Sequence, residues 1–516
     1  MKNPNCSVMR YFHSSEHKCE SRGWLGCTQE LITASRLLFA AFTILLLGGC
    51  VAVGPDYVPP ETAVPGAWAS QLCSGLRAGE MDPAEVARWW TKLGDPVLSN
   101  LVDRAVAGNL DLKEARARVR EARARRGITR ADRFPTMNTS ASGSSKHTSE
   151  KSGSGVTREL YSAGFDASWE VDLFGGKQRA VEAAEAGLQA SEEELRDVLV
   201  SIVAEVALNY VEFRTFQNRL EITEQNLQRQ KETSEIAGWR CEAGLVTELD
   251  VERAKRNLEQ TRSQIPPLQA SLKRAENRLC VLLGQHPGTL EDILSERKPI
   301  PVPPLEVAVG VPADVLRRRP DVRHAERLLA ASTAQVGVAT AARFPTFSLA
   351  GSIGLEALKL GDLFSSGSRI SSLASNIAWT IFDAGRIKQN IRVQSALQEQ
   401  ALIRYDAAVH KALEEVENAL VAYAKEQLRR RSLLKAMEAA QRTVNLVRTQ
   451  YASGVIDFQV VLDAERSLLT LQDQTTESEG KITSNLIRLY KALGGGWTPM
   501  KCPAACANEK KQDLMP

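Results

Sequence analysis

The chain has 516 residues, of which 25% are charged and only 6% aromatic, and its formal net charge is +3. This balance gives no reason to expect nucleic acid as a partner, and its nine cysteines show no zinc or disulfide pattern. Abundant Ala, Leu, Gln, Glu and Arg favour long helices, so a mainly α protein is expected.

The first predicted element is a signal peptide over residues 1–49. Arg36 precedes the apolar run Leu37 to Leu47, which is too short to cross a bilayer as a helix and suits a signal-peptide core. The run ends in Leu-Gly-Gly-Cys, which is similar to a lipobox, so Cys50 is expected to carry lipid at the mature N-terminus. An ordinary secretory signal with a chance cysteine is the alternative. No other long apolar run follows, so any segment that crosses a membrane must be a β-strand.

The rest of the chain repeats itself at a constant offset of 210 residues. The motif Arg133-Phe134-Pro135-Thr136 recurs as Arg343-Phe344-Pro345-Thr346, and Trp169 recurs as Trp379. We therefore expect two copies of one structural unit. The expected organisation is a lipid-anchored extension at 50–94, repeat 1 at 95–284, a periplasmic linker at 285–311, repeat 2 at 312–497 and a polar tail at 498–516.

Each copy should contain a pair of amphipathic strands. In copy one they are predicted at Thr136 to Ser145 and around Phe165 to Leu173, where apolar and polar side chains alternate. In copy two they are predicted at Phe347 to Leu355 and around Leu373 to Ile381. Each pair should be joined by a polar loop, at 146–159 and 356–369.

Alternating strands of about ten residues suit the wall of a transmembrane barrel. Four strands per chain cannot close such a barrel, because about eight are the minimum. Three chains would supply twelve strands and two would supply eight, so the strand count leaves a trimer and a dimer open. A soluble sandwich is the further alternative.

Long proline-free helices follow the strands. They are predicted from Lys177 to about Gly238 and from Arg386 to about Ser453, and the first would be about 90 Å long at about 1.5 Å per residue. Such helices should form a tube or bundle that projects from the barrel. Each should reverse at a glycine, Gly244 or Gly454. Pro266-Pro267 should kink the first return helix, whereas the second contains no proline.

Several motifs together resemble the outer membrane factor family, the TolC-like channels, and within it the lipoprotein branch of NodT type. They are Cys50 with Val53-Gly54-Pro55-Asp56-Tyr57, the segment Leu316 to Arg323, both RFPT motifs, and the ending Leu489 to Trp497. The arginines of the second motif, Arg317 to Arg319, are interpreted as structural rather than as a ligand site.

The resemblance implies a homotrimer with one twelve-stranded barrel in the outer membrane and one helical tunnel in the periplasm. It implies the exit duct of a tripartite efflux system that passively conducts toxic small molecules such as drugs, solvents or organic acids. The implied partners are a periplasmic membrane-fusion adaptor, an inner-membrane pump of the RND or a related type, and outer-membrane lipid. It implies no catalytic residues, cofactor or metal. A type I secretion duct for proteins and a periplasmic adaptor are the alternatives.

The resemblance also places candidate site residues beside the two helix reversals. The implied adaptor-docking tips are Gly244, Leu245, Gly454 and Val455, for which helix capping is the alternative role.

The implied pore gate is Asp463 with Tyr451. Asp463 resembles the acidic position that rings the pore entrance in the family, and its copy-one counterpart is Arg253. Ile456 stands where some members carry an arginine. A surface ion pair between Asp463 and Arg466 is the alternative role of Asp463.

Overall fold

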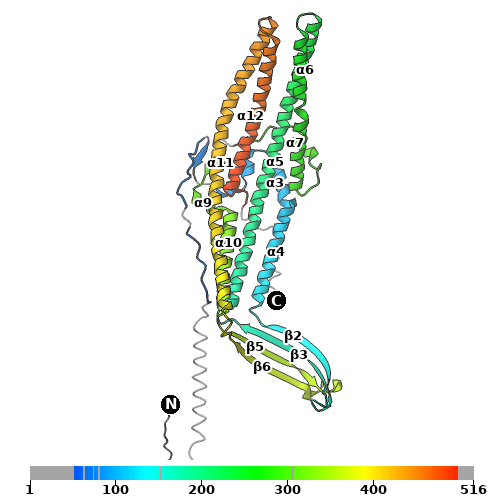
Figure 1. The fold of residues 1–516 in the computed structure, drawn as a ribbon, viewed down its shortest axis with the longest axis vertical. Helices are drawn as coiled ribbons and strands as arrows, with labels where there is room; N and C mark the ends of the chain where they lie inside the picture. The colour runs from blue at the N-terminus through cyan, green and yellow to red at the C-terminus, as the bar shows by residue number, and fades with distance from the viewer. Residues whose placement is uncertain are drawn as a thin grey trace, which may run out of the picture. The chain divides into compact units, whose positions relative to one another are not determined.

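The computed structural model describes residues 52–497 except 62–63, 74, 80–81, 152 and 304–306. The signal peptide, Cys50 and the C-terminal tail lie outside the described residues. Figure 1 shows a β-sheet at one end of a set of long helices and the turns of the helical hairpins at the other end. Among the described helices, none combines the length and apolar composition that a membrane span requires.

The two copies contain matching elements in the same order, except that the return helix of copy one is divided in two. Copy one consists of α4 (Leu110–Ala131), β2 (Thr136–His147), β3 (Thr157–Val171), α5 (Gly176–Glu242), α6 (Glu248–Arg262) and α7 (Ile265–Leu282). Copy two consists of α10 (Pro320–Ala341), β5 (Thr346–Ala357), β6 (Arg369–Ala378), α11 (Arg386–Ala452) and α12 (Phe458–Ala492). Helices α5 and α11 have 67 residues each, which is about 100 Å of helix. The predictions of a duplicated unit and of very long helices are confirmed.

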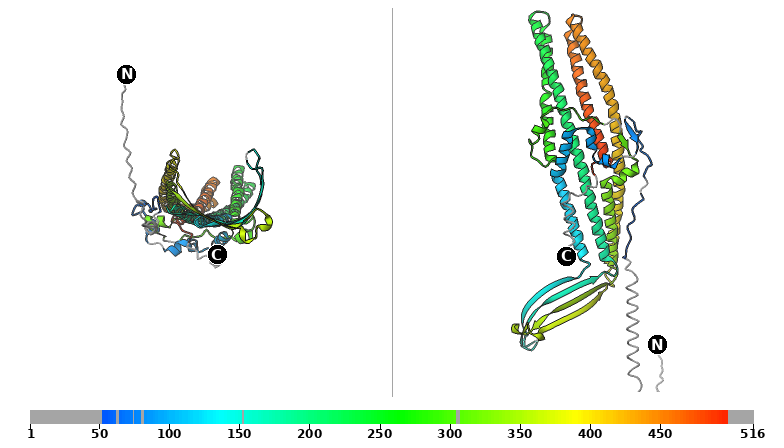
Figure 2. Two further views of the ribbon diagram at one scale, coloured as in Figure 1. Left: turned by 90° about the horizontal axis from the view of Figure 1, so that it is seen from below. Right: turned by 180° about the vertical axis from the view of Figure 1, so that it is seen from behind.

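The four large strands form one antiparallel sheet in the order β2-β3-β5-β6. The register pairs Val171 with Phe347 and Phe347 with Ile377, so apolar side chains from three strands share one face. The other face carries hydroxyl pairs at matching positions of the two copies, Ser142 with Ser162 at 2.9 Å and Ser352 with Ser372 at 2.7 Å. Figure 2 shows that the sheet is curved, and both edge strands, β2 and β6, lack a further partner among the described residues.

The strand ends differ from the predicted ones. Leu173, Trp379 and Ile381 lie beyond β3 and β6. In the observed register, the partner of Trp379 would be Pro345, which has no N–H to donate to the ladder. Pairing therefore ends at Ala378, and Trp379 instead donates its indole N–H to the carbonyl of Arg343 at 3.0 Å.

The connections between the strands are shorter than predicted, at 148–156 and 358–368. The prediction that both are polar was wrong for the second one. It contains two short 3-10 turns, η2 (Leu360–Asp362) and η3 (Ser366–Ser368), and it exposes Leu358, Leu360 and Phe364. Its apolar residues are spaced too irregularly to produce a periodic signal.

The long helices reverse at the predicted glycines. Gly244 has φ 71° and Gly454 has φ 74°, a left-handed conformation that caps a helix C-terminus at low steric cost. The first return helix is interrupted between α6 and α7, where proline removes backbone donors. The second return helix, α12, is continuous over 35 residues. The predicted difference between the two return helices is confirmed.

The main hydrophobic core lies at the middle of α5, where α3 (Pro96–Gly108), α7 and α12 pack against it. Leu98, Tyr210, Leu279 and Leu486 are fully buried in this core. Short elements surround it: β1 (Leu76–Ala78), α2 (Pro83–Ala87), η1 (Trp89–Leu93), α8 (Glu291–Leu294), β4 (Val307–Val309) and α9 (Pro312–Arg318).

Candidate functional site

The two hairpin turns expose one apolar residue each, at matching positions. Leu245 follows Gly244 and is 73% exposed, and Val455 follows Gly454 and is 71% exposed. Both helix ends close with the same kind of backbone hydrogen bond. The N–H groups of Leu245 and Val455 each donate to the carbonyl of the residue five positions earlier. Each glycine is therefore a cap, and each apolar side chain after it remains available for a partner.

A small apolar cluster lies beneath the turns and joins the two hairpins. Its buried members, which we call the tip cluster, are Ala237, Ala254, Val447, Phe458, Val461 and Leu462. The half-buried Tyr451 packs on this cluster with its ring 5.2 Å from that of Phe458. The guanidinium of Arg240, from the other hairpin, lies 4.9 Å from the centre of the Tyr451 ring. Tyr451 therefore contacts both hairpins of one chain.

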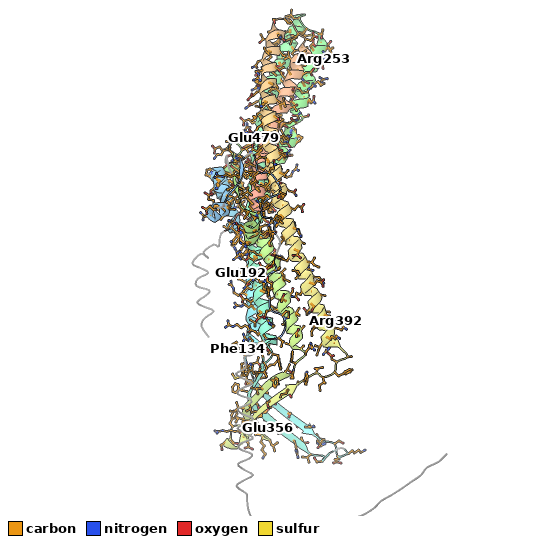
Figure 3. The ribbon with its side chains drawn as sticks, turned by 90° about the vertical axis from the view of Figure 1, so that its left-hand side faces the viewer. Phe134, Glu192, Arg253, Glu356, Arg392 and Glu479 are labelled. Carbon is orange, nitrogen blue, oxygen red and sulfur yellow. The ribbon has the colours of Figure 1, made fainter. Side chains whose placement is uncertain are left out.

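Asp463, the predicted gate residue, lies on α12 with its side chain 53% exposed. Gln459 donates a hydrogen bond of 2.9 Å to its carboxylate. Arg466 lies 3.6 Å from the same carboxylate, so the alternative ion pair is present within one chain. Exposed ion pairs contribute about 0–1 kcal/mol, and this one leaves much of the carboxylate open. Its counterpart Arg253 pairs with Asp250 at 3.5 Å. Figure 3 labels Arg253 near the hairpin turns.

Polar contacts link the α5–α6 hairpin to α12 along a groove between them. A cavity of about 510 Å³ lies there. Arg219 makes two hydrogen bonds to Asp473, at 2.6 and 2.9 Å. Nearer the tip, Arg466 donates to Asn257 at 2.7 Å. The buried Gln230 also lines the groove, and its side-chain oxygen has no hydrogen-bond partner. Sequence reasoning did not identify these links, because they join positions about 200 or more residues apart.

The motif residues that follow Cys50 dock at the base of the helices. The buried Arg179 donates to the carbonyl of Val53 at 3.2 Å and to the carboxylate of Asp56 at 2.6 Å. Tyr57 donates to Glu326 on α10 at 3.1 Å. Gly54 lies so close to Gly337 that a Cβ there would be 2.4 Å from the Gly337 Cα. These contacts give the motif a structural role.

The arginine motif also has a structural role. Arg319 is buried and donates to Asp321 at 2.7 and 3.0 Å, to Glu415 at 2.6 Å and to the carbonyl of Ala492 at 3.0 Å. Burial opposes ionisation of Asp321, but the hydrogen bond and charge of Arg319 outweigh it and hold the pKa of Asp321 below its usual range. The arginine thus joins the start of α10 to the end of α12.

Within the described part of the chain, no group of three or more His, Cys, Asp or Glu side chains is placed to hold a metal ion.

Comparison with known proteins places this architecture among outer-membrane channels. Residues 101–285 and 311–495 match the outer membrane efflux protein family. The chain is 32% identical over 468 residues to nodulation protein T of Rhizobium leguminosarum bv. trifolii, covering 89% of this chain and 97% of that protein. It is 33% identical over 468 residues to the solvent efflux pump outer membrane protein SrpC of Pseudomonas putida, covering 89% and 97%.

A solved structure of the outer-membrane channel OprN has the same fold. It superimposes with a TM-score of 0.82 at 38% identity, covering 87% of this chain and all of that one. These similarities confirm the resemblance inferred from the motifs, and they argue against a periplasmic adaptor, the alternative from another class. The chain therefore belongs to the outer membrane efflux protein family and is an outer-membrane efflux channel of two-repeat α/β fold.

Proposed function

We propose that three copies of the chain form the exit duct of a tripartite efflux system. The curved sheet carries this proposal, because it has one apolar face, one hydroxyl-rich face and two open edges in β2 and β6. Each unpaired backbone group in lipid costs several kcal/mol, so the edges must be paired by other copies. Three copies supply the twelve strands of a closed barrel with the hydroxyl-rich face toward the lumen.

The long helices would continue this barrel as a periplasmic tunnel. At about 100 Å, α5 and α11 are long enough to carry the lumen far from the membrane. Their turns would present Leu245 and Val455 to a periplasmic membrane-fusion adaptor, which connects the duct to an inner-membrane pump of the RND or a related type. The exposure of these two apolar side chains supports a docking role.

The gate is assigned to the tip of copy two. Threefold symmetry would bring three copies of Asp463 toward one axis, where like charges favour bound cations. Tyr451 would hold the two hairpins of each chain together through Phe458 and Arg240. The polar links along the groove between the hairpins can exchange with water, which makes that seam easier to open than an apolar one.

The duct would conduct toxic small molecules, such as drugs, solvents or organic acids, by passive diffusion. The name of SrpC, a solvent efflux protein, supports cargo of this kind. Lipid on Cys50 would add a second attachment to the outer membrane. Changing Cys50→Ser should remove the lipid mass from the mature protein and leave barrel insertion intact. An unmodified N-terminus in the wild type would contradict the lipidation.

Two adjacent residues of β5 provide a direct test of the barrel. Ile353 lies on the apolar face and Ser352 on the hydroxyl-rich face. A lysine on the lipid face of a barrel costs about 2–4 kcal/mol at the bilayer midplane. Ile353→Lys should therefore reduce the amount of protein in the outer membrane severely, whereas Ser352→Lys should be tolerated.

Native mass spectrometry of the detergent-extracted wild type should show three subunits. A conducting monomer or dimer, or equal tolerance of the two lysines, would rule out the proposed barrel.

A further inference from the structure

Charged residues are few on the hydroxyl-rich face of the sheet, and they are unevenly distributed along it. The strands place five there: Lys146, Arg158, Asp166, Glu170 and Glu356. Their face follows from the register, because Asp166 contacts Ser140 and because Glu356 lies opposite Ser162. The two cations lie at the end of the strands farthest from the helices.

Lys146 and Arg158 lie directly opposite each other in the β2–β3 pair. Directly opposite residues have Cβ atoms about 4.5–5.5 Å apart, and like charges at such positions are destabilising. Neither side chain forms an ion pair or hydrogen bond within the described part of the chain. The acid of the same face nearest in register, Glu356, lies about four residues along β3 from Arg158, or roughly 13 Å.

The repeat shows that this pair of cations occurs in copy one alone. The positions that match Lys146 and Arg158 in copy two are Glu356 and Ser368. In copy two the strand pairing ends at Leu355 and Arg369, and Ser368 lies in η3, so only copy one carries a cross-strand pair of cations at this level. Neither cation has a side-chain partner among the described residues of its own hairpin, so the charges point to a role in what the face contacts.

The charge on this face changes sign along the strands. Asp166 is eight residues from Arg158 along β3, or roughly 26 Å, and Glu170 is twelve residues away, or roughly 40 Å. Figure 3 labels Glu356, which lies between the cations and these acids in register. The face is therefore positive at the end with the turns and negative toward the helices.

We propose that Lys146 and Arg158 form an anion-binding site at the outer mouth of the duct, for phosphate, carboxylate or sulfonate groups of passing solutes. Three copies would make a ring of six cations above rings of acids. Arginine binds such oxyanions through paired N–H donors, and lysine adds a point charge. A narrow lumen concentrates the field of these rings, so ion current should depend on the sign of the voltage. This inference rests on the proposed function, because the face lines a lumen only in a closed barrel.

Planar bilayers that contain the purified wild-type channel test the site. Inorganic phosphate added on the side of the strand turns should reduce the current, and currents at opposite voltages should differ. In the double variant Lys146→Gln, Arg158→Gln the phosphate effect should disappear and the ratio of the two currents should fall below that of the wild type. The matched control is Arg369→Gln, because Arg369 lies opposite Leu355 on the apolar face. This variant should behave like the wild type.

The outcomes separate this inference from the function on which it rests. A double variant that keeps the phosphate effect and the voltage dependence overturns the anion site while the duct stands. An equal effect of Arg369→Gln assigns the behaviour to the overall charge of the rim and also overturns the site. A wild-type protein that forms no conducting trimer overturns the proposed duct, and the anion site with it.

Discussion

In both copies a side chain donates a hydrogen bond to a backbone carbonyl at the end of the return helix, but the two side chains differ. In copy one, Asn109 donates to the carbonyl of Leu282 at 2.8 Å. In copy two, 210 residues later, Arg319 donates to the carbonyl of Ala492 at 3.0 Å. The fold therefore fixes where the hydrogen bond must be, and it accepts either an amide or a guanidinium as the donor. The arginine has additional partners, because it also binds Asp321 and Glu415.

At the hairpin tips, the two copies use the same residue in the turn but different side chains beside it. Both turns need a left-handed residue and both use glycine. Beside the turns the copies differ, since Asp463 matches Arg253 and Tyr451 matches Cys241. Geometry is shared between the copies where the backbone demands it, whereas the charged and aromatic side chains assigned to the gate occur only in copy two.

Removing the contacts of Arg319 should produce the largest loss of stability. Changing Arg319→Met leaves two carboxylates without their buried partner, and breaking a buried ion pair costs about 3–5 kcal/mol. Because Asp321 and Glu415 are partly exposed, we expect the lower end of that range. Asn109→Ala, at the matching position, should cost about 1–3 kcal/mol, because it leaves the buried carbonyl of Leu282 unsatisfied. Thermal unfolding of the detergent-solubilised trimer measures both. Equal losses would contradict the difference between the copies.

Acidification should have a related effect. The pKa of Asp321 is lower in the folded chain than in the unfolded one, so this group stabilises the fold above its unfolded pKa of about 3.9. That stability is lost as the pH falls from there through the folded pKa. Arg319→Met should therefore reduce the loss of unfolding free energy that accompanies acidification. Asn109→Ala should leave this pH dependence unchanged.

The next effect concerns close packing of the second return helix. A Cβ at Gly480 would lie 2.2 Å from the hydroxyl of Thr215 on α5. The matching position in copy one is Ala270, which is exposed. Gly480→Ala should therefore destabilise the trimer by about 1–3 kcal/mol through overpacking.

Adding Thr215→Ala should restore part of the stability lost in Gly480→Ala, because it removes the clashing hydroxyl. Thermal unfolding of the single and double variants decides between additive and coupled effects. Strictly additive losses would contradict the contact.

A smaller effect on stability, with a larger one on transport, is expected at the turns. A left-handed conformation costs an L-residue about 1–2 kcal/mol, and valine is bulkier still. Gly454→Val should impair efflux, measured as drug resistance in cells that depend on this channel, without preventing trimer assembly. Gly244→Val is the matched variant in copy one. Normal resistance with Gly454→Val would count against the docking role of the copy-two tip.

The gate should appear in single-channel currents with little change in stability. Asp463 makes only exposed contacts with Gln459 and Arg466, so Asp463→Ala should alter stability by no more than about 1 kcal/mol. In planar bilayers it should lower cation selectivity and raise conductance, because it removes the ring of acids. Arg253→Ala, the counterpart, should do less. Unchanged conductance and selectivity in Asp463→Ala would refute the gate.

Much of the fold followed from local patterns. The constant offset, the alternation around Trp169 and the glycines at the reversals all predicted elements that the structure contains, because each depends on residues close in sequence. The ends of β6 required the register with Pro345, and the hydrogen bond shared by Asn109 and Arg319 required the packing of distant helices. Such contacts leave no local period in the sequence. The candidate site was located by resemblance, whereas its links to the other hairpin came from the structure.

The smallest effect is expected for the contact between Arg240 and Tyr451, which joins copy one to copy two at the tips. The matching positions are Gln450 and Cys241, so the repeat contains no second contact of this kind. A cation–π pair at an exposed site contributes about 0.5–1 kcal/mol. A double-mutant cycle of Arg240→Gln and Tyr451→Leu should therefore give a coupling energy of that size in thermal unfolding. Tyr451→Phe should retain most of it, because the ring rather than the hydroxyl faces the guanidinium. Effects that simply add would show that Tyr451 acts through the tip cluster alone and gains nothing from Arg240.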